Sequence, residues 1–467
     1  MRYPMNDVVV VVPGIMGSTL HKNGKPVWEP TTGGVIANLR DRFKGLNSLK
    51  LPEAIGDGHP DDGVTAEALM PDIRLPLGLW TFDVGYTRLV AFLTETFELN
   101  PDPTKGPVNL LLFPYDWRLS NRFNGEQLGA ASEAMLDQWR RRGGPFADAR
   151  AVFICHSMGG LVARWYVDHL GGAEHTKALI TLGTPHRGAL DALDQLVNGI
   201  SKGIGPFKLT LTELARSLPS LYQLLPEYAC IDESGALRKT TEISLPELDT
   251  GMVSDAMEFH TQIDTARHAS ARQYDLHPIG GFEQPTATTA RLHGSKVVAV
   301  RSIDGNDERG DATVPRLSFT PPDVPPSTPG AHYAADKHGG LVGNQSVFDQ
   351  IEGVLTASDV VHRGPERRLS VDVPEVLDPG EPLVVRAELV QGDLPLDVVV
   401  ADERGVELGP PDRLLPGDGS LRATPDLPGP GVYQVTVRGA GRAGPQVSPI
   451  TTIVLAWPSE EELGPLA

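Results

Sequence analysis

The feature that most constrains this chain is a strand pattern that ends abruptly at a serine. Residues 151–155 are apolar and partly β-branched, which predicts a buried strand, and a helix pattern bearing alanine and leucine starts at once after Ser157. Gly159 follows two positions later, as in the strand–turn–helix motif G-x-S-x-G. Such a turn strains the serine backbone and holds its hydroxyl clear of the sheet. We therefore predict that Ser157 is a nucleophile.

Cys155 occupies the position where this motif has its first glycine. Cysteine is small and tolerates burial, so we interpret it as a permitted variant and not as a second nucleophile. The alternative for Ser157 is an ordinary helix N-cap, a position that favours serine. The preceding strand and the glycines at 159 and 160 favour the nucleophile.

The five consecutive valines at 8–12 predict a buried strand of parallel type, because a β-branched run of this length is too short for a helix. A glycine-containing loop, residues 13–18, follows it. Hydrolases with this strand–turn–helix motif take one oxyanion-hole amide from such a loop and the other from the residue after the nucleophile. We predict the amides of Met16 and Met158 for these roles, with Ile15 as the alternative to Met16. A plain strand-to-helix turn is the structural alternative.

Helix and strand patterns alternate through the first part of the chain. Apolar spacing predicts helices over residues 86–99 and 126–142, and strands over residues 108–113 and 178–182. This alternation predicts an α/β protein, a doubly wound and mostly parallel sheet of the α/β-hydrolase type. We assign residues 1–362 to this domain.

Two stretches lack the pattern and predict insertions that form a cap or lid, at about residues 19–80 and 190–290. The first is rich in glycine, proline and aspartate. The second has apolar residues at helical spacing up to residue 225, whereas residues 230–290 are polar and irregular. An apolar cap face fits ordinary packing or a lipid-facing gate, and periodicity does not separate the two.

Strand character resumes over residues 296–302, and a loop with several acids follows. An acid after a late strand and then a histidine complete the hydrolase order Ser, Asp, His. We favour Asp311, because Gly310 allows a sharp turn and an apolar segment follows, with Asp304 and Asp307 as alternatives.

The base has two candidates, His332 and His338. His338 precedes two glycines and a plausible final core helix, so it lies in the expected loop. His186 also follows a strand, but it comes too soon after Ser157 for this order, and we interpret it as a loop residue near the site.

Beyond residue 362 the pattern changes to short alternating segments separated by turns rich in Pro, Gly and Asp. We predict an all-β, immunoglobulin-like sandwich over residues 363–458, although the Cys-Trp-Cys spacing of true immunoglobulin domains is missing. Residues 459–467 form an acidic tail. The sandwich contains no recognisable catalytic motif. A protein partner of the sandwich is possible, but the sequence does not identify one.

Composition narrows the function. The net charge of −19 over 467 residues argues against a general affinity for nucleic acid. Two cysteines give no disulfide framework, and no signal-type or membrane-spanning run occurs, so we expect a cytoplasmic protein. The Asp-rich segment 56–63 lacks the spacing of a calcium loop, so we expect neither a metal nor a cofactor.

Several blocks together resemble the lecithin:cholesterol acyltransferase family, which includes lysosomal phospholipase A2-like enzymes and bacterial esterases. They are residues 12–18, 114–118 (Pro-Tyr-Asp-Trp-Arg), 156–160, 182–185, 310–314 and 337–339. The block at 114–118 is the most specific. The likeness covers roughly residues 8–356 in scattered pieces, excludes the β-rich part, and suggests a bacterial-type member.

The resemblance implies that Ser157 is the nucleophile, Asp311 the orienting acid and His338 the base, with Met16 and Met158 as oxyanion donors. We also assign four residues to substrate binding: Trp28, Trp117, Thr184 and Pro185. The disulfides of secreted members are missing, which agrees with a cytoplasmic setting.

We expect acyl-ester chemistry on a phospholipid or other lipid ester, which a membrane surface could present, through an acyl-serine that passes its acyl group to water or to an alcohol. Two alternatives stay open: a non-catalytic scaffold that positions the β-sandwich for a partner, and a serine peptidase with the same three residues.

Overall fold

The computed structural model describes residues 2–29, 48–71, 75–76, 81–82, 85–202, 209–269, 274–328, 331–356, 368–389, 394–417 and 419–459. Its centre is a six-stranded sheet in the order β19-β14-β9-β8-β1-β7, in which every neighbouring pair is parallel. The strands are β1 (Val8–Val12), β7 (Leu110–Leu112), β8 (Ala151–His156), β9 (Thr176–Leu182), β14 (Asp275–Gly281) and β19 (His332–Ala334).

The valine run forms the inside of this sheet. All residues of β1 are buried, and β1 pairs with β7 on one side and β8 on the other, with Val10 opposite Leu111 and Phe153. A strand covered on both faces has no polar side, which is why the valines are continuous and do not alternate with polar residues. The predicted α/β class is confirmed.

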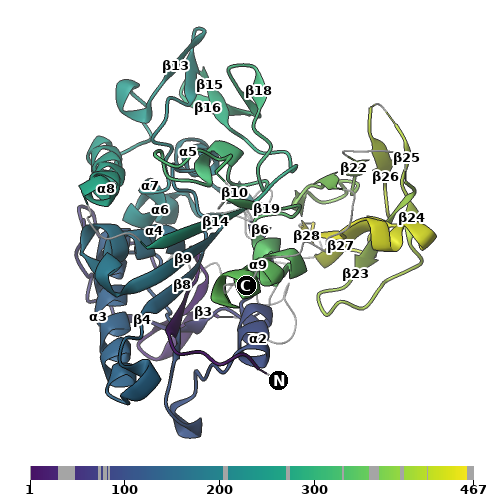
Figure 1. The fold of residues 1–467 in the computed structure, drawn as a ribbon. Helices are drawn as coiled ribbons and strands as arrows, with labels where there is room; N and C mark the ends of the chain where they lie inside the picture. The colour runs from purple at the N-terminus through teal and green to yellow at the C-terminus, as the bar shows by residue number, and fades with distance from the viewer. Residues whose placement is uncertain are drawn as a thin grey trace.

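Helices cover both faces of the sheet (Figure 1). On one side lie α3 (Asn121–Arg140) and α4 (Gly159–Arg164); on the other lie α2 (Thr87–Thr96) and α9 (Gln345–Thr356). Phe92 of α2 stacks on Phe348 of α9, with ring centroids 4.5 Å apart. Helix α3 begins five residues before the predicted start at residue 126, because the Ser120 side chain caps it by accepting the Phe123 amide.

The strand predicted over residues 296–302 is not part of the central sheet. Residues Lys296–Val300 form β16, which pairs with β15 (Thr289–His293) in a separate four-stranded sheet. The core strand is β14, which lies inside the stretch 190–290 predicted as an insertion. The sequence of β14 lacks a clear strand pattern, because it contains Pro278, Gly280 and Gly281, and proline and glycine are disfavoured in strands.

The rest of the second insertion is more regular than predicted. Residues 250–269, part of the stretch predicted to be irregular, form the long helix α8. The other elements of this stretch are α5 (Leu190–Asn198), α6 (Thr212–Arg216), α7 (Pro219–Tyr222), β10 (Ser201–Lys202), β11 (Leu209–Thr210), β12 (Ile231–Glu233) and β13 (Ala236–Arg238). Beyond it, the pair β17 (Ser302–Ile303) and β18 (Asn306–Asp307) follows β16. Figure 1 shows β13, β15, β16 and β18 together at the end of the molecule beyond α5.

The first insertion contains an antiparallel sheet of β2 (Ser18–Lys22), β3 (Lys25–Trp28) and β4 (Val64–Leu69), in the order β3-β2-β4. The short pair β5 (Leu75–Pro76) and β6 (Thr81–Phe82) follows. Residues 30–47, 72–74 and 77–80 of the predicted insertion lie outside the described residues.

The C-terminal part consists of two largely antiparallel sheets, in the orders β20-β22-β26-β25 and β21-β28-β27-β23-β24. Both sheets contribute to one hydrophobic cluster. Their strands are β20 (Leu369–Asp372), β21 (Val376–Leu377), β22 (Val385–Leu389), β23 (Leu396–Ala401), β24 (Asp412–Arg413), β25 (Leu415–Pro416), β26 (Leu421–Ala423), β27 (Gly431–Gly439) and β28 (Ile450–Ala456).

The immunoglobulin-like plan of this part stays a prediction. The predicted boundary at 362/363 lies outside the described residues, as does the acidic tail from residue 460 onward.

We predict that Gly281→Ala destabilises the fold by about 1–3 kcal/mol, the usual cost of overpacking. A Cβ at this end of β14 would lie 2.5 Å from both the Asp311 Cβ and the Asp336 carbonyl oxygen. Urea unfolding measures the change. Gly409→Ala is the matched control, because no heavy atom lies within 4 Å of its added Cβ. Equal unfolding midpoints for the two variants would contradict the prediction.

Candidate active site

Ser157 lies in the turn between β8 and α4 with a φ of 52°, a left-handed conformation that is uncommon for a residue other than glycine. Its amide donates to the Leu182 carbonyl at 2.8 Å, and its carbonyl accepts from Gly160 N at 3.0 Å and Thr184 Oγ1 at 2.9 Å. These bonds to β9, to α4 and to the loop after β9 fix the strained turn.

Two glycines after the serine allow this turn to pack against its neighbours. A Cβ on Gly159 would overlap the Pro13 carbonyl oxygen, and one on Gly160 would overlap the Thr184 side chain. Position 155 does not require a glycine, since the side chain of Cys155 is accommodated there as a buried residue of β8. Burial raises the pKa of the Cys155 thiol well above its usual value, so the thiol stays protonated.

The structure brings Ser157, His338 and Asp311 together although they are far apart in the sequence. Ser157 Oγ lies 2.9 Å from His338 Nε2, and His338 Nδ1 lies 2.7 Å from Asp311 Oδ2. The three residues are 2%, 4% and 0% exposed. The imidazole therefore has one nitrogen toward the serine hydroxyl and the other toward the carboxylate, and all three side chains are buried.

Asp311 is held by its own loop. Its Oδ1 accepts the amides of Thr313 at 3.0 Å and Val314 at 2.7 Å, which leaves Oδ2 for His338. The carbonyl of Asp311 also accepts the His338 amide at 2.8 Å. Asp311 and His338 are thus joined through both side chain and backbone.

The other candidates lie elsewhere. Asp304 and Asp307 are exposed at the β17–β18 turn, and His332 is in β19. His186 is buried and shares a hydrogen bond of 3.2 Å with Thr181 Oγ1.

Met16 lies in the loop after β1 with a φ of 59°, a second strained residue at the site. Its carbonyl accepts the indole N–H of Trp28 at 2.8 Å. Met158 is the residue after Ser157, at the start of α4. The oxyanion roles of the two amides stay predictions.

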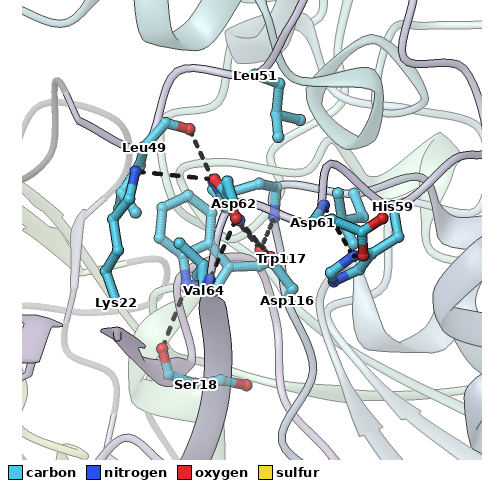
Figure 2. A network of polar contacts seen from close by, with 12 residues as sticks. Ser18, Lys22, Leu49, Leu51, His59, Asp61, Asp62, Val64, Asp116 and Trp117 are labelled. Carbon is cyan, nitrogen blue, oxygen red and sulfur yellow. Dashed lines mark hydrogen bonds and ion pairs between the residues drawn. The ribbon is translucent and has the colours of Figure 1, made fainter. Parts of the chain in front are cut away.

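The block Tyr115–Arg118 braces the loop after β1, a role that the sequence did not reveal. Tyr115 Oη donates to the Pro13 carbonyl at 2.8 Å, and the Tyr115 amide donates to Ser18 Oγ at 3.0 Å. Trp117 Nε1 donates to the Ser18 carbonyl at 3.2 Å, as Figure 2 shows. The loop is therefore fixed at both of its ends.

Arg118 anchors this block from within. Its fully buried guanidinium binds Asp116 at 2.7 Å, Asp62 at 2.8 Å and the Leu49 carbonyl at 3.1 Å. Figure 2 shows Asp62 and Asp116 next to each other in the middle of these contacts. Partial burial alone would raise the pKa of Asp62, but the hydrogen bond and charge of Arg118 lower it overall.

The four residues predicted to bind substrate are all buried. Trp28 packs edge-on against Trp117 at a centroid distance of 6.2 Å, and Thr184 is bonded to the Ser157 carbonyl. Pro185 lies in the same loop, where its carbonyl accepts the Gly188 amide. These contacts support the site; binding of substrate by these residues stays a prediction.

Two residues at the site were missed. Tyr86, just before α2, and His156, just before the serine, are buried and bonded to each other at 3.0 Å. The position of His156 next to Ser157 was the one signal available in the sequence.

Among the described residues, no group of three or more His, Cys, Asp or Glu is arranged to hold a metal ion. No helix in the described part of the chain has the length and apolar character to cross a bilayer.

Comparison with known proteins gives a family match. The model of the family "Lecithin:cholesterol acyltransferase" matches residues 107–274. Lysosomal phospholipase A and acyltransferase of Homo sapiens is 31% identical over 119 residues, which cover 24% of this chain and 27% of that protein. An uncharacterized protein of Saccharomyces cerevisiae is 29% identical over 157 residues, 33% of this chain and 20% of that protein. The chain thus spans about a quarter of the length of the curated relatives it matches.

Three solved structures are similar at low identity. A chain of the Tle4–Tli4 complex is 14% identical with a TM-score of 0.48, and covers 76% of this chain and 99% of its own. Bacillus licheniformis lipase BlEst2 in mature form is 13% identical with a TM-score of 0.37, over 76% and 94%. Phospholipase PlaB from Legionella pneumophila, in complex with thio-NAD, is 9% identical with a TM-score of 0.29, over 82% and 87%.

The matched residues 107–274 include the Tyr115–Arg118 block and the Ser157 turn, whereas Asp311 and His338 lie beyond them. The bacterial character of the chain stays a prediction. The family that the motifs indicated is the one whose model matches: residues 107–274 of this chain match the lecithin:cholesterol acyltransferase family.

Proposed function

We propose that this protein is a serine hydrolase that cleaves lipid esters through an acyl-serine intermediate. One observation carries the proposal: Ser157 Oγ, on a strained turn, lies 2.9 Å from His338 Nε2, while Asp311 Oδ2 lies 2.7 Å from the other nitrogen of that imidazole. A hydroxyl with this arrangement of base and acid is the usual activated nucleophile of acyl transfer.

In the first step His338 Nε2 takes the hydroxyl proton as Ser157 Oγ attacks the ester carbonyl carbon. The carbonyl oxygen becomes an oxyanion, which the amides of Met16 and Met158 stabilise. Asp311 keeps the Nδ1 proton on the imidazole and stabilises the imidazolium. His338 then gives its proton to the departing alcohol, the ester bond breaks, and the acyl-serine remains.

In the second step an acceptor hydroxyl releases the acyl group. His338 takes the proton of the acceptor hydroxyl as the acceptor oxygen attacks the acyl-serine. The bond between the acyl group and Ser157 Oγ then breaks, and His338 returns a proton to Ser157 Oγ. Water gives a free acid, whereas an alcohol gives a new ester. We favour water, because it is the default acceptor of an acyl group.

Lipid esters are the favoured substrates because of the family match and because the human relative is named a phospholipase A and acyltransferase. That protein shares only about a quarter of its length with this chain, so its substrate enters here as part of the proposal. A cytoplasmic setting is likewise part of the proposal.

We predict that Ser157→Ala lowers kcat on p-nitrophenyl acyl esters at least 10⁴-fold, roughly the loss seen on removal of such a nucleophile, and leaves the unfolding midpoint close to wild type. Fluorophosphonate labelling, checked by mass spectrometry, should modify Ser157 alone. Ser132→Ala is the control, because Ser132 is a buried serine of α3. Hydrolysis of peptides but not esters would favour a peptidase; neither turnover nor labelling would favour a scaffold.

We predict that Asp311→Asn lowers kcat by roughly 10³ to 10⁴-fold, because the amide favours the wrong imidazole tautomer while the geometry stays intact. The control is Asp307→Asn at the exposed β17–β18 turn, which should retain wild-type kcat. A larger loss in Asp307→Asn than in Asp311→Asn would show that the acid has been assigned to the wrong residue.

A further inference from the structure

Tyr86 and His156 are buried polar residues that the chemistry proposed above does not use. Tyr86 is 1% exposed and His156 2% exposed. The Gly14 amide donates to Tyr86 Oη at 2.8 Å, Tyr86 Oη lies 3.0 Å from His156 Nδ1, and His156 Nε2 lies 3.2 Å from the carbonyl oxygen of His338. A continuous chain of hydrogen bonds therefore connects the loop after β1 to the backbone of the proposed base.

The donors and acceptors in this chain fit in one way. The Gly14 N–H can only donate, so Tyr86 Oη accepts there. The His338 carbonyl can only accept, so the proton of a neutral His156 ring lies on Nε2, and Nδ1 accepts the single hydrogen of Tyr86 Oη. Nδ1 then carries no proton, and Nε2–H donates to the His338 carbonyl. Burial, with the nearby His338 ring, lowers the pKa of His156 to about 3, in agreement with a neutral ring.

This chain of hydrogen bonds reaches the proposed base at its backbone carbonyl, whereas Asp311 binds other groups of the same residue. Asp311 accepts both the Nδ1–H and the backbone amide of His338, whereas His156 donates to its carbonyl. The rings of His156 and His338 lie 5.0 Å apart. The residue that faces Ser157 is therefore fixed at its side chain and at both of its backbone groups.

At the other end, the loop after β1 folds around the tyrosine hydroxyl. A Cβ on Gly17 would lie 2.9 Å from Tyr86 Oη, and one on Gly14 would lie 2.8 Å from the Ser157 Cβ and 3.2 Å from His156 Nδ1. Gly17 N also donates to the Gly14 carbonyl at 3.0 Å, which closes the turn that contains Met16. The hydroxyl of Tyr86 thus lies against this turn at both Gly14 and Gly17.

We propose that Tyr86 and His156 act as a pair of positioning residues. They hold the loop after β1, which carries Met16, at a fixed separation from His338 on either side of Ser157. The proposal rests on the function proposed above. It assigns neither residue a contact with substrate. Its expected signature is a loss of kcat with little change in KM, because substrate binds to other groups while the two loops must match the transition state.

The first test is Tyr86→Phe, which removes one hydroxyl and leaves Gly14 N–H and His156 Nδ1 without their partner. We expect kcat to fall by roughly 10 to 100-fold, the scale of a misplacement of about 1 Å, with KM within about twofold of wild type. Tyr166→Phe is the matched control, because it also removes one hydroxyl from a buried tyrosine, here one that donates to Glu133. A kcat for Tyr86→Phe equal to that of Tyr166→Phe would overturn the proposal.

The second test compares two replacements of His156. Gln keeps a donor near the position of Nε2, whereas Leu has none, so His156→Gln should retain a kcat roughly tenfold above that of His156→Leu. If packing alone mattered, the apolar residue would serve as well as the amide, and equal kcat values would therefore contradict the positioning role.

The third test does not depend on turnover. In full-length protein labelled with ¹⁵N-histidine, the signals of His156 are those lost in His156→Gln. We expect a neutral ring protonated at Nε2 from pH 5 to 8, and a shift of the Nδ1 resonance in Tyr86→Phe. A proton on Nδ1, or titration in this range, would overturn the proposal even if Ser157 proves to be the nucleophile; the expected signals would support the hydrogen-bond chain even if the ester substrate is wrong.

Discussion

The site depends on how closely two backbone segments approach each other beneath Ser157. The first turn of α4 packs on the carbonyls of Val12 and Pro13, at a separation that leaves no room for a side chain on Gly159. This contact keeps the strained turn pressed against the end of β1, and bonds from Leu182 and Thr184 hold it from the β9 side. A serine released from these contacts would relax toward an ordinary backbone conformation and withdraw its hydroxyl from His338.

The parallel sheet then explains why residues so distant in sequence meet. Ser157 follows β8, the loop with Met16 follows β1, and His338 follows β19, so all three lie beyond carboxyl ends of parallel strands, where α/β sheets bind their ligands. Asp311 reaches this edge differently. The chain leaves β14, forms β15 to β18, and returns at Gly310, whose carbonyl accepts the Gln284 amide at 3.0 Å. The acid loop is therefore attached to the sheet through β14.

How much of this could be predicted from the sequence differs between elements. The valines of β1 and the strand–serine–glycine junction are local signals, and both predictions agree with the structure. In β14 the residues that break the strand pattern serve tertiary contacts: a Cβ on Gly280 would overlap the Phe319 ring, and Gly281 packs against Asp311. Tertiary packing overrides local propensity there, so a reading of patterns along the chain misses the strand.

Helix α8 was missed for a related reason. Its buried residues Val253, Ala256, Phe259 and Ile263 recur at helical spacing, but polar residues surround them and the amphipathic signal is weak. Contacts between elements support it, such as the ion pair of Arg122 with Asp255 at 2.9 Å. The hydrogen-bond chain through Tyr86 also depends on a tertiary contact. It could not be predicted from local patterns, because Tyr86 and His156 lie 70 residues apart in the sequence.

The last strand, β28, connects the C-terminal sheets to the hydrophobic core around the central sheet. In β28, Ile450 and Val454 belong to the hydrophobic cluster of the two C-terminal sheets, whereas Ile453 and Leu455, together with Trp457 just beyond the strand, belong to the cluster that contains the valines of β1. Side chains of a strand alternate between its faces, so β28 buries one face in each cluster. Gln284 adds a polar connection: its side chain donates to the Leu369 carbonyl and accepts the Val371 amide. The same segment that follows β14 thus accepts β20 and leads to the acid loop, so the stability of the C-terminal sheets and the placement of Asp311 depend on shared contacts.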